Sequence, residues 1–139
     1  MSELPAIFDR LRLPVVAAPL FIISTPDLVI AQCKAGIVGS FPALNAREQD
    51  GDPIMLDIWL SQITVELDRH NQANPDSPAA PFAVNQIVHR SNARLDRDLE
   101  QVAGDQVFQT FAHVAAAGFG DGAVDDHRQG VDRLVVDED

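Results

Sequence analysis

The chain has 139 residues, of which 46% are hydrophobic, and it carries a formal net charge of −11. This length predicts one domain with a sizeable core, and the negative charge argues against nucleic-acid binding through phosphates. The single cysteine, Cys33, excludes an internal disulfide and a cysteine-based metal cluster.

Location follows from the same features. No apolar run approaches the roughly 20 residues of a membrane-spanning helix, and the N-terminus lacks the basic-then-apolar order of a signal peptide. We therefore expect a soluble, cytoplasmic protein that does not contact a membrane, with no bound metal and with Cys33 as a structural thiol.

The first predicted element is a strand over residues 14–18. This run is short, continuous and rich in valine, which is the pattern of a strand buried on both faces in a parallel sheet. Pro19 ends it. Ser24 and Thr25 offer side-chain oxygens that cap a helix beginning at Pro26.

The helix is predicted to end at Gly36 as a left-handed C-cap, and residues 37–40 follow as a second strand. Two parallel strands joined by one helix form a right-handed βαβ unit, and ligands bind such units at the carboxyl ends of the strands. Here those ends are residues 18–21 and the pair Ser40 and Phe41.

The same alternation continues downstream. Residues 45–53 are a predicted surface loop, residues 56–71 an amphipathic helix with Trp59 in the core, and residues 81–85 a third strand. A helix over 91–102, capped by Ser91, follows. This order predicts a parallel sheet, and the absence of a G-x-G-x-x-G turn favours a (β/α)₈ barrel over an open doubly wound sheet.

The composition changes near residue 104. Residues 104–139 hold eight acidic and only two basic side chains. We therefore predict two regions: a partial barrel domain over residues 1–103, with about three βα units, and an atypical acidic tail over 104–139. The tail is expected to be disordered or partly helical, with helical spacing at residues 106–117.

Two motifs resemble a known family. The strand-one turn matches the pattern AP(M/L)…TPxLxxAxxxAGxxG, and the end of the third strand matches PFxVN. The matching residues are Ala18, Pro19, Leu20, Thr25, Pro26, Leu28, Ala31, Ala35, Gly36 and Gly39, then Pro81, Phe82, Val84 and Asn85. Over about residues 10–100 the sequence resembles the N-terminal portion of nitronate monooxygenases, formerly called 2-nitropropane dioxygenases.

The resemblance implies the N-terminal part of an α/β (β/α)₈ TIM barrel that binds FMN and oxidises alkyl nitronates with molecular oxygen to carbonyl compounds and nitrite. A flavin ring needs close backbone contacts and one or two amide side chains. The implied FMN-binding residues are Ala18, Pro19, Leu20, Phe21, Ser40 and Asn85. Gln86, which strand alternation turns away from Asn85, and His89 are weaker candidates, and no catalytic residue is assigned.

The sequence is compatible with more than one class of function. The family's later strands, its phosphate-binding loops and its histidine near the substrate are not matched from residue 101 onward. The chain is thus either such an enzyme or a non-catalytic remnant that serves as an interaction module; a different FMN-binding or nucleotide-binding barrel is the third alternative. Because an incomplete barrel leaves apolar faces and an edge exposed, we also expect a marginally stable chain that either associates with itself or stays partly molten.

Overall fold

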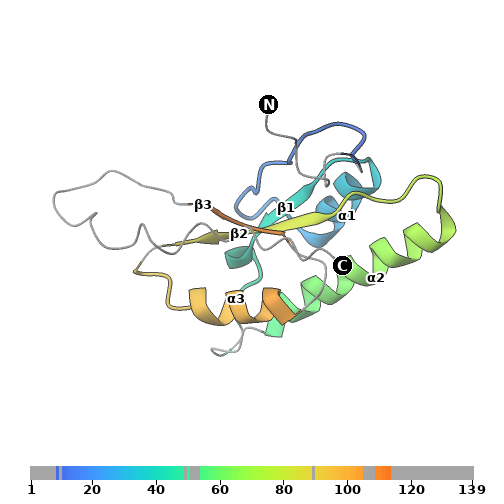
Figure 1. Ribbon diagram of the computed structural model, residues 1–139. Coiled ribbons are helices and arrows are strands. Elements are labelled where there is room, and N and C mark those ends of the chain that lie inside the picture. Colours follow the sequence, from blue (N-terminus) through green and yellow to red (C-terminus); the bar gives the residue numbers. More distant parts are fainter. Residues whose placement is uncertain are drawn as a thin grey trace.

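The computed structural model describes residues 9, 11–48, 50, 54–88, 90–104 and 109–113 and shows a mixed α/β structure (Figure 1). Its sheet contains β1 (Gly39–Pro42), β2 (Phe82–Ile87) and β3 (Gln109–His113), in the order β1-β2-β3. Both pairs are parallel. The predicted parallel sheet is confirmed, and over the described residues it is open, not closed into a barrel.

Three α-helices lie within the described part of the chain: α1 (Pro26–Lys34), α2 (Ile54–Ala73) and α3 (Leu95–Gly104). A short 3-10 helix, η2 (Ala43–Asn45), follows β1. Figure 1 shows α2 and α3 together below the sheet. The three predicted helices are confirmed, and none of the described helices is long and apolar enough to cross a membrane.

The two ends of α1 were predicted with unequal success. The helix begins at Pro26 as expected, but Thr25 makes no side-chain cap bond, and the Ser24 hydroxyl turns back to accept a hydrogen bond from the Leu20 amide. At the other end Gly36 has φ +89°, as a left-handed C-cap requires. The amide of Ile37 donates to the carbonyl of Gln32, which completes a Schellman motif.

The start of α3 also differs from the prediction. The helix begins at Leu95 and not near Ser91, because a turn at Asn92 comes first. The side-chain oxygen of Asn92 accepts from the Arg94 amide at 3.2 Å, and its backbone oxygen accepts from the Leu95 amide at 3.3 Å. A local Asx turn of this kind competes with helical bonding.

The core lies on one face of the sheet. Phe41, Phe82 and Val84 are at most 1% exposed, and alternate residues of a strand share a face. They pack with helix residues Val29, Ile30, Cys33, Leu56, Leu60, Ile63, Leu67 and Val102. Trp59 was predicted in the core; it is half-buried and packs against the edge of this cluster, with its ring centroid 5.5 Å from that of Phe41.

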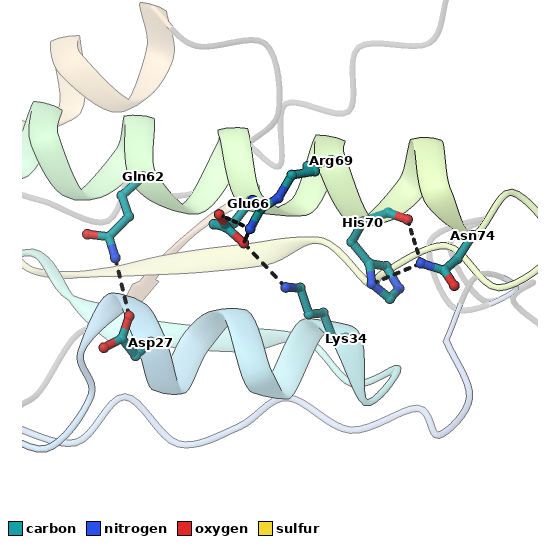
Figure 2. Close-up of polar contacts among 7 residues, drawn as sticks. All are labelled: Asp27, Lys34, Gln62, Glu66, Arg69, His70 and Asn74. Carbon is teal, nitrogen blue, oxygen red and sulfur yellow. Dashed lines mark hydrogen bonds and ion pairs between the residues drawn. The ribbon is translucent and has the colours of Figure 1, made fainter.

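Polar contacts join α1 to α2 along their exposed sides (Figure 2). Gln62 donates to Asp27 at 3.2 Å, and Lys34 forms an ion pair with Glu66 at 3.5 Å. Residues near the start of α1 thus meet an earlier part of α2 than residues at its end, so the two helices run in the same direction. A hydrogen bond from Arg69 holds the pKa of Glu66 below its ordinary value.

The first predicted strand is reduced to a single bridge. Val16 pairs with Val38 in parallel, and no longer strand forms over residues 14–18. The expectation of burial on both faces is wrong, because Val15 and Val16 are 46% and 44% exposed. Within the described residues this segment has a strand neighbour on its β1 side only, so its other edge remains open.

The region after residue 104 contributes to the sheet. Residues 109–113 form β3 in parallel with β2, whereas the sequence predicted helical spacing over 106–117. Sheet pairing prevails there over the helical periodicity. The boundary at residue 104 stays a prediction, and the rest of the acidic tail lies outside the described residues.

Gly39 gives a test of how closely β1 approaches α1. A Cβ at this position would lie 2.5 Å from the Val29 carbonyl oxygen and 2.9 Å from the Cys33 sulfur. We expect Gly39→Ala to lower the free energy of unfolding by about 1–3 kcal/mol, measured by urea denaturation. Ser61→Ala, at an exposed position of α2, should change it by less than about 0.5 kcal/mol. Equal stability of the two variants would contradict the close approach.

Candidate functional site

The candidate site lies at the carboxyl edge of the parallel sheet. Three connections lie there: residues 19–25 after the Val16 bridge, residues 43–48 after β1, and residues that follow β2 up to α3. In parallel sheets this edge is where ligands bind, because loops from successive strands converge on it. The sequence placed the site at the same edge.

The first connection is an apolar loop, which we define as residues 20–23. Leu20, Phe21, Ile22 and Ile23 are 47%, 62%, 65% and 62% exposed, respectively. Ile22 has φ +69°, a left-handed conformation that a β-branched residue rarely adopts and that costs roughly 1–3 kcal/mol. The surrounding contacts must therefore hold this loop in shape.

Asn45 supplies most of these contacts. Its side-chain oxygen accepts a hydrogen bond from the Ile22 amide at 3.0 Å. Its side-chain nitrogen donates to the backbone oxygens of Leu20 and Ser24, each at 3.0 Å. The buried Ser24 hydroxyl accepts from the Leu20 amide at 2.8 Å. The bonded backbone groups of Leu20 and Ile22 thus face Asn45 and Ser24, while the four apolar side chains of the loop stay exposed.

Arg94 ties the second connection to the third. It donates to the Ala46 backbone oxygen at 2.9 Å and forms ion pairs with Glu48 at 3.3 Å and with Asp98 at 3.1 Å. Asp98 is fully buried. Burial raises the pKa of the Asp98 carboxyl, and the positive charge of Arg94 opposes this shift.

The predicted FMN-binding residues 18–21 differ in whether their backbone groups are already hydrogen-bonded. Leu20 has both its amide and its carbonyl engaged inside the loop, so its backbone is not free for a ligand as predicted. Ala18 makes no hydrogen bond within the described residues and is exposed; Pro19 is half-buried, and Phe21 exposes its ring. A free peptide group at Ala18 is thus the available backbone contact.

Ser40 and Asn85 differ in whether the side chain is already hydrogen-bonded. The buried Ser40 hydroxyl donates to the Ala17 carbonyl, which gives Ser40 a role in joining the first segment to β1. Asn85 is half-buried, and its carboxamide makes no hydrogen bond within the described part of the chain. Of the two side chains, the Asn85 amide is the one available to a ligand.

Gln86 lies on the opposite face from Asn85, as strand alternation predicted. It is fully buried on the face that carries Phe82 and Val84, and neither atom of its amide group has a partner among the described residues. This position faces the helices and not the loops. His89, the other weaker candidate, lies outside the described residues.

Contacts connect the first segment, β1 and β2 near this edge. The Val16–Val38 bridge sets the first segment beside the start of β1, and the Ser40 hydroxyl bonds the Ala17 carbonyl. In the sheet, Ser40 pairs with Ala83 and Pro42 pairs with Asn85. Asn45 follows Pro42 by three residues, and its side chain bonds the Leu20 carbonyl.

Asn45 and Arg94 were missed by the sequence analysis. Residues 45–53 were assigned to a surface loop, although Ala46 is fully buried. The signal was available for Asn45, because it closely follows a short buried strand in the way that made Asn85 a candidate. Nothing in the local sequence pairs Arg94 with Ala46.

Nucleophilic and metal chemistry find little support here. Cys33 is buried, and burial raises the pKa of its thiol to about 11, so it is protonated at neutral pH. Within the described residues, no group of three or more histidine, cysteine or acidic side chains is placed to hold a metal ion.

Comparisons with models of protein families, with curated proteins and with solved structures found no match for this chain. The functional argument therefore rests on the residues and their geometry.

Asp98 gives the site region a specific pH dependence. Its pKa in the folded chain is raised above the value of about 3.9 in unfolded peptides, so between the two values the folded state binds more protons. Its contribution to stability is thus greatest at low pH and is lost as pH rises through the folded pKa. The stability of wild type relative to Asp98→Asn should fall as pH rises from about 4 to about 7.

Urea unfolding of both proteins across this range measures the difference. Asp68→Asn, at an exposed position of α2, controls for the loss of one carboxylate. The raised pKa of Asp98 would be contradicted if the stability difference between wild type and Asp98→Asn depended on pH in the same way as the difference between wild type and Asp68→Asn.

Proposed function

We propose that this chain carries the first βα units of an FMN-dependent (β/α)₈ barrel that oxidises alkyl nitronates, with molecular oxygen, to carbonyl compounds and nitrite. The observation that carries the proposal is the Asn85 carboxamide near the carboxyl edge of the sheet, which has no hydrogen bond to any of the described residues. It stands in the PFxVN motif, and the AP(M/L) motif supplies the exposed Ala18 peptide at the same edge.

The order of the strands supports a barrel. The segment at Val16, then β1, β2 and β3, lie side by side in chain order and in parallel. The strand residues of the core, Phe41, Phe82 and Val84, pack with residues of α1, α2 and α3 on one face. Successive units of a (β/α)₈ barrel have this arrangement, whereas doubly wound sheets place helices on both faces.

The residues fit the ring of a flavin in part. Ser40 and Ala83 are paired and have little side-chain bulk, the Ser40 hydroxyl bonds the carbonyl of Ala17 next to Ala18, and Asn85 lies two residues beyond Ala83. The Asn85 amide both donates and accepts, which suits the nitrogen and oxygen atoms at the pyrimidine edge of the ring. FMN supplies the redox chemistry when bound. In this proposal Asn85 orients the ring and the apolar loop keeps water from it.

A second candidate is a non-catalytic interaction module that keeps the fold's first units. The observation in its favour is the exposed apolar loop, since exposed apolar surface commonly marks a contact site. A different flavin or nucleotide barrel oxidoreductase is the third alternative. A cytoplasmic location is part of the proposal and is supported by the unpaired thiol of Cys33.

Flavin retention tests the proposal. The purified chain, mixed with FMN and freed of excess, should keep a visible flavin absorbance band. Asn85→Ala should weaken FMN binding by about tenfold, the effect of removing hydrogen bonds to the ring. Asn74→Ala, an exposed asparagine at the end of α2, should leave it unchanged.

The outcomes separate the alternatives. Nitrite release from an alkyl nitronate under oxygen supports the enzyme, and NAD(P)H oxidation without nitrite supports another flavin oxidoreductase. A folded chain that retains no flavin would falsify the flavin proposal and favour the interaction module.

We also propose that the chain associates with itself through residues 13–23. Seven large hydrophobic residues are exposed there: Leu13, Val15, Val16, Leu20, Phe21, Ile22 and Ile23. From Leu13 to Pro26 the sequence contains no charged residue, although the chain carries −11 overall. Two copies that meet at this segment bring no like charges directly together.

Sedimentation equilibrium tests this contact. Wild type should show species larger than one chain, and Phe21→Asp should shift the distribution to the monomer because a charge then enters the interface. Val65→Asp is a matched control, since Val65 on α2 is 63% exposed and Phe21 is 62% exposed. A wild-type monomer, or equal effects of both variants, would contradict the proposed contact.

A further inference from the structure

We propose that Asn45 is the positioning residue that holds the apolar loop, residues 20–23, as a preformed wall of the flavin site beside Asn85. This inference rests on the proposed function. It assigns to the turn after β1 a role in ligand binding that neither sequence motif indicates.

The contacts of Asn45 decide the orientation of the loop. One carboxamide engages three backbone groups: the Ile22 amide, the Leu20 carbonyl and the Ser24 carbonyl. The Ser24 amide also donates to the Leu20 carbonyl at 3.0 Å. These bonds fix the backbone at Leu20, Ile22 and Ser24, and they hold the loop in a shape that exposes its four apolar side chains.

The chemistry requires asparagine at this position. A carboxamide accepts at its oxygen and donates twice at its nitrogen, and this pattern matches one amide and two carbonyls of the loop. Aspartate at the same place accepts only, so it faces two carbonyl oxygens without a donor. The left-handed φ of Ile22 makes the loop dependent on these bonds, because the conformation is unfavourable without them.

The position of the loop connects it to the site. Asn45, which bonds the Leu20 carbonyl, comes three residues after Pro42, and Pro42 pairs with Asn85 near the carboxyl edge. The four apolar side chains of the loop are each 47% exposed or more, and none belongs to the core cluster. They are therefore available to cover an apolar ring whose polar edge meets Asn85.

Arg94 fixes the turn that carries Asn45. It donates to the carbonyl of Ala46, the residue after Asn45, and is itself paired with the buried Asp98. The turn that carries Asn45 is thus fixed to α3 while its side chain fixes the loop. A preformed wall of this kind lowers the ordering cost of binding.

Three variants of the full chain test the inference by FMN titration and by the visible circular dichroism of the bound flavin. Asn45→Ala and Asn45→Asp should each weaken FMN binding by about tenfold and change the dichroism. Asn71→Ala is the matched control, because the Asn71 side chain also bonds a backbone amide, that of Ala79 at 2.8 Å, in the segment ahead of β2. It should leave FMN affinity within about twofold of wild type.

Hydrogen exchange supplies a second readout besides FMN affinity. In wild type, FMN should slow exchange of the Ile22 amide, and Asn45→Ala should speed it in the absence of FMN. If the Asn45 variants do not fold, the wild-type exchange measurement alone decides: no slowing by FMN overturns the inference.

The remaining outcomes separate the two proposals. If wild type binds FMN and the Asn45 variants bind it as well as Asn71→Ala does, the positioning role is wrong and the proposed function stands. If folded wild type binds no FMN, both are overturned.

Discussion

The turn at Asn45 and Ala46 is the constraint on which the carboxyl edge of the sheet depends. The Asn45 side chain holds the loop that precedes α1, and the Ala46 carbonyl is held by Arg94 ahead of α3. Two adjacent residues after β1 therefore fix the connections of both neighbouring segments. Sheet pairing sets the strands side by side, but these side-chain contacts determine what the loops present at the edge where ligands bind.

The end of α1 and the start of β1 depend on two glycines. Gly39 lets β1 approach α1 to a distance that no side chain would permit, and the Schellman motif at Gly36 returns the chain from α1 to β1 within a few residues. The helices cover the face of the sheet that carries Phe41, Phe82 and Val84. Asn85 lies on the opposite face. The core therefore lies on the helix-covered face of the sheet.

Local patterns predicted most of the secondary structure, because each element carries its own signal. The extents of α1 and α2 and the position of β2 follow from apolar spacing, from Pro26 and from Gly36. The two failures have different causes: Ser24 makes a local bond to the Leu20 amide in place of capping α1, and residues 109–113 join the sheet through nonlocal pairing against their helical spacing. Asn85 could be found from its place at the end of the predicted strand, whereas the contacts of Arg94 with Ala46 and Glu48 depend on tertiary structure alone.

The buried thiol of Cys33 has a consequence for how the molecule opens. The sulfur lies between α1 and β1, with its hydrogen directed to the Pro81 carbonyl, and it is the only thiol in the chain. A reagent can reach it only when α1 separates from the sheet. The rate of its alkylation therefore reports the kinetics of local unfolding at this one interface, without an engineered probe. Under fast reclosure, that rate yields the free-energy difference between the closed and open forms of the helix that bears it.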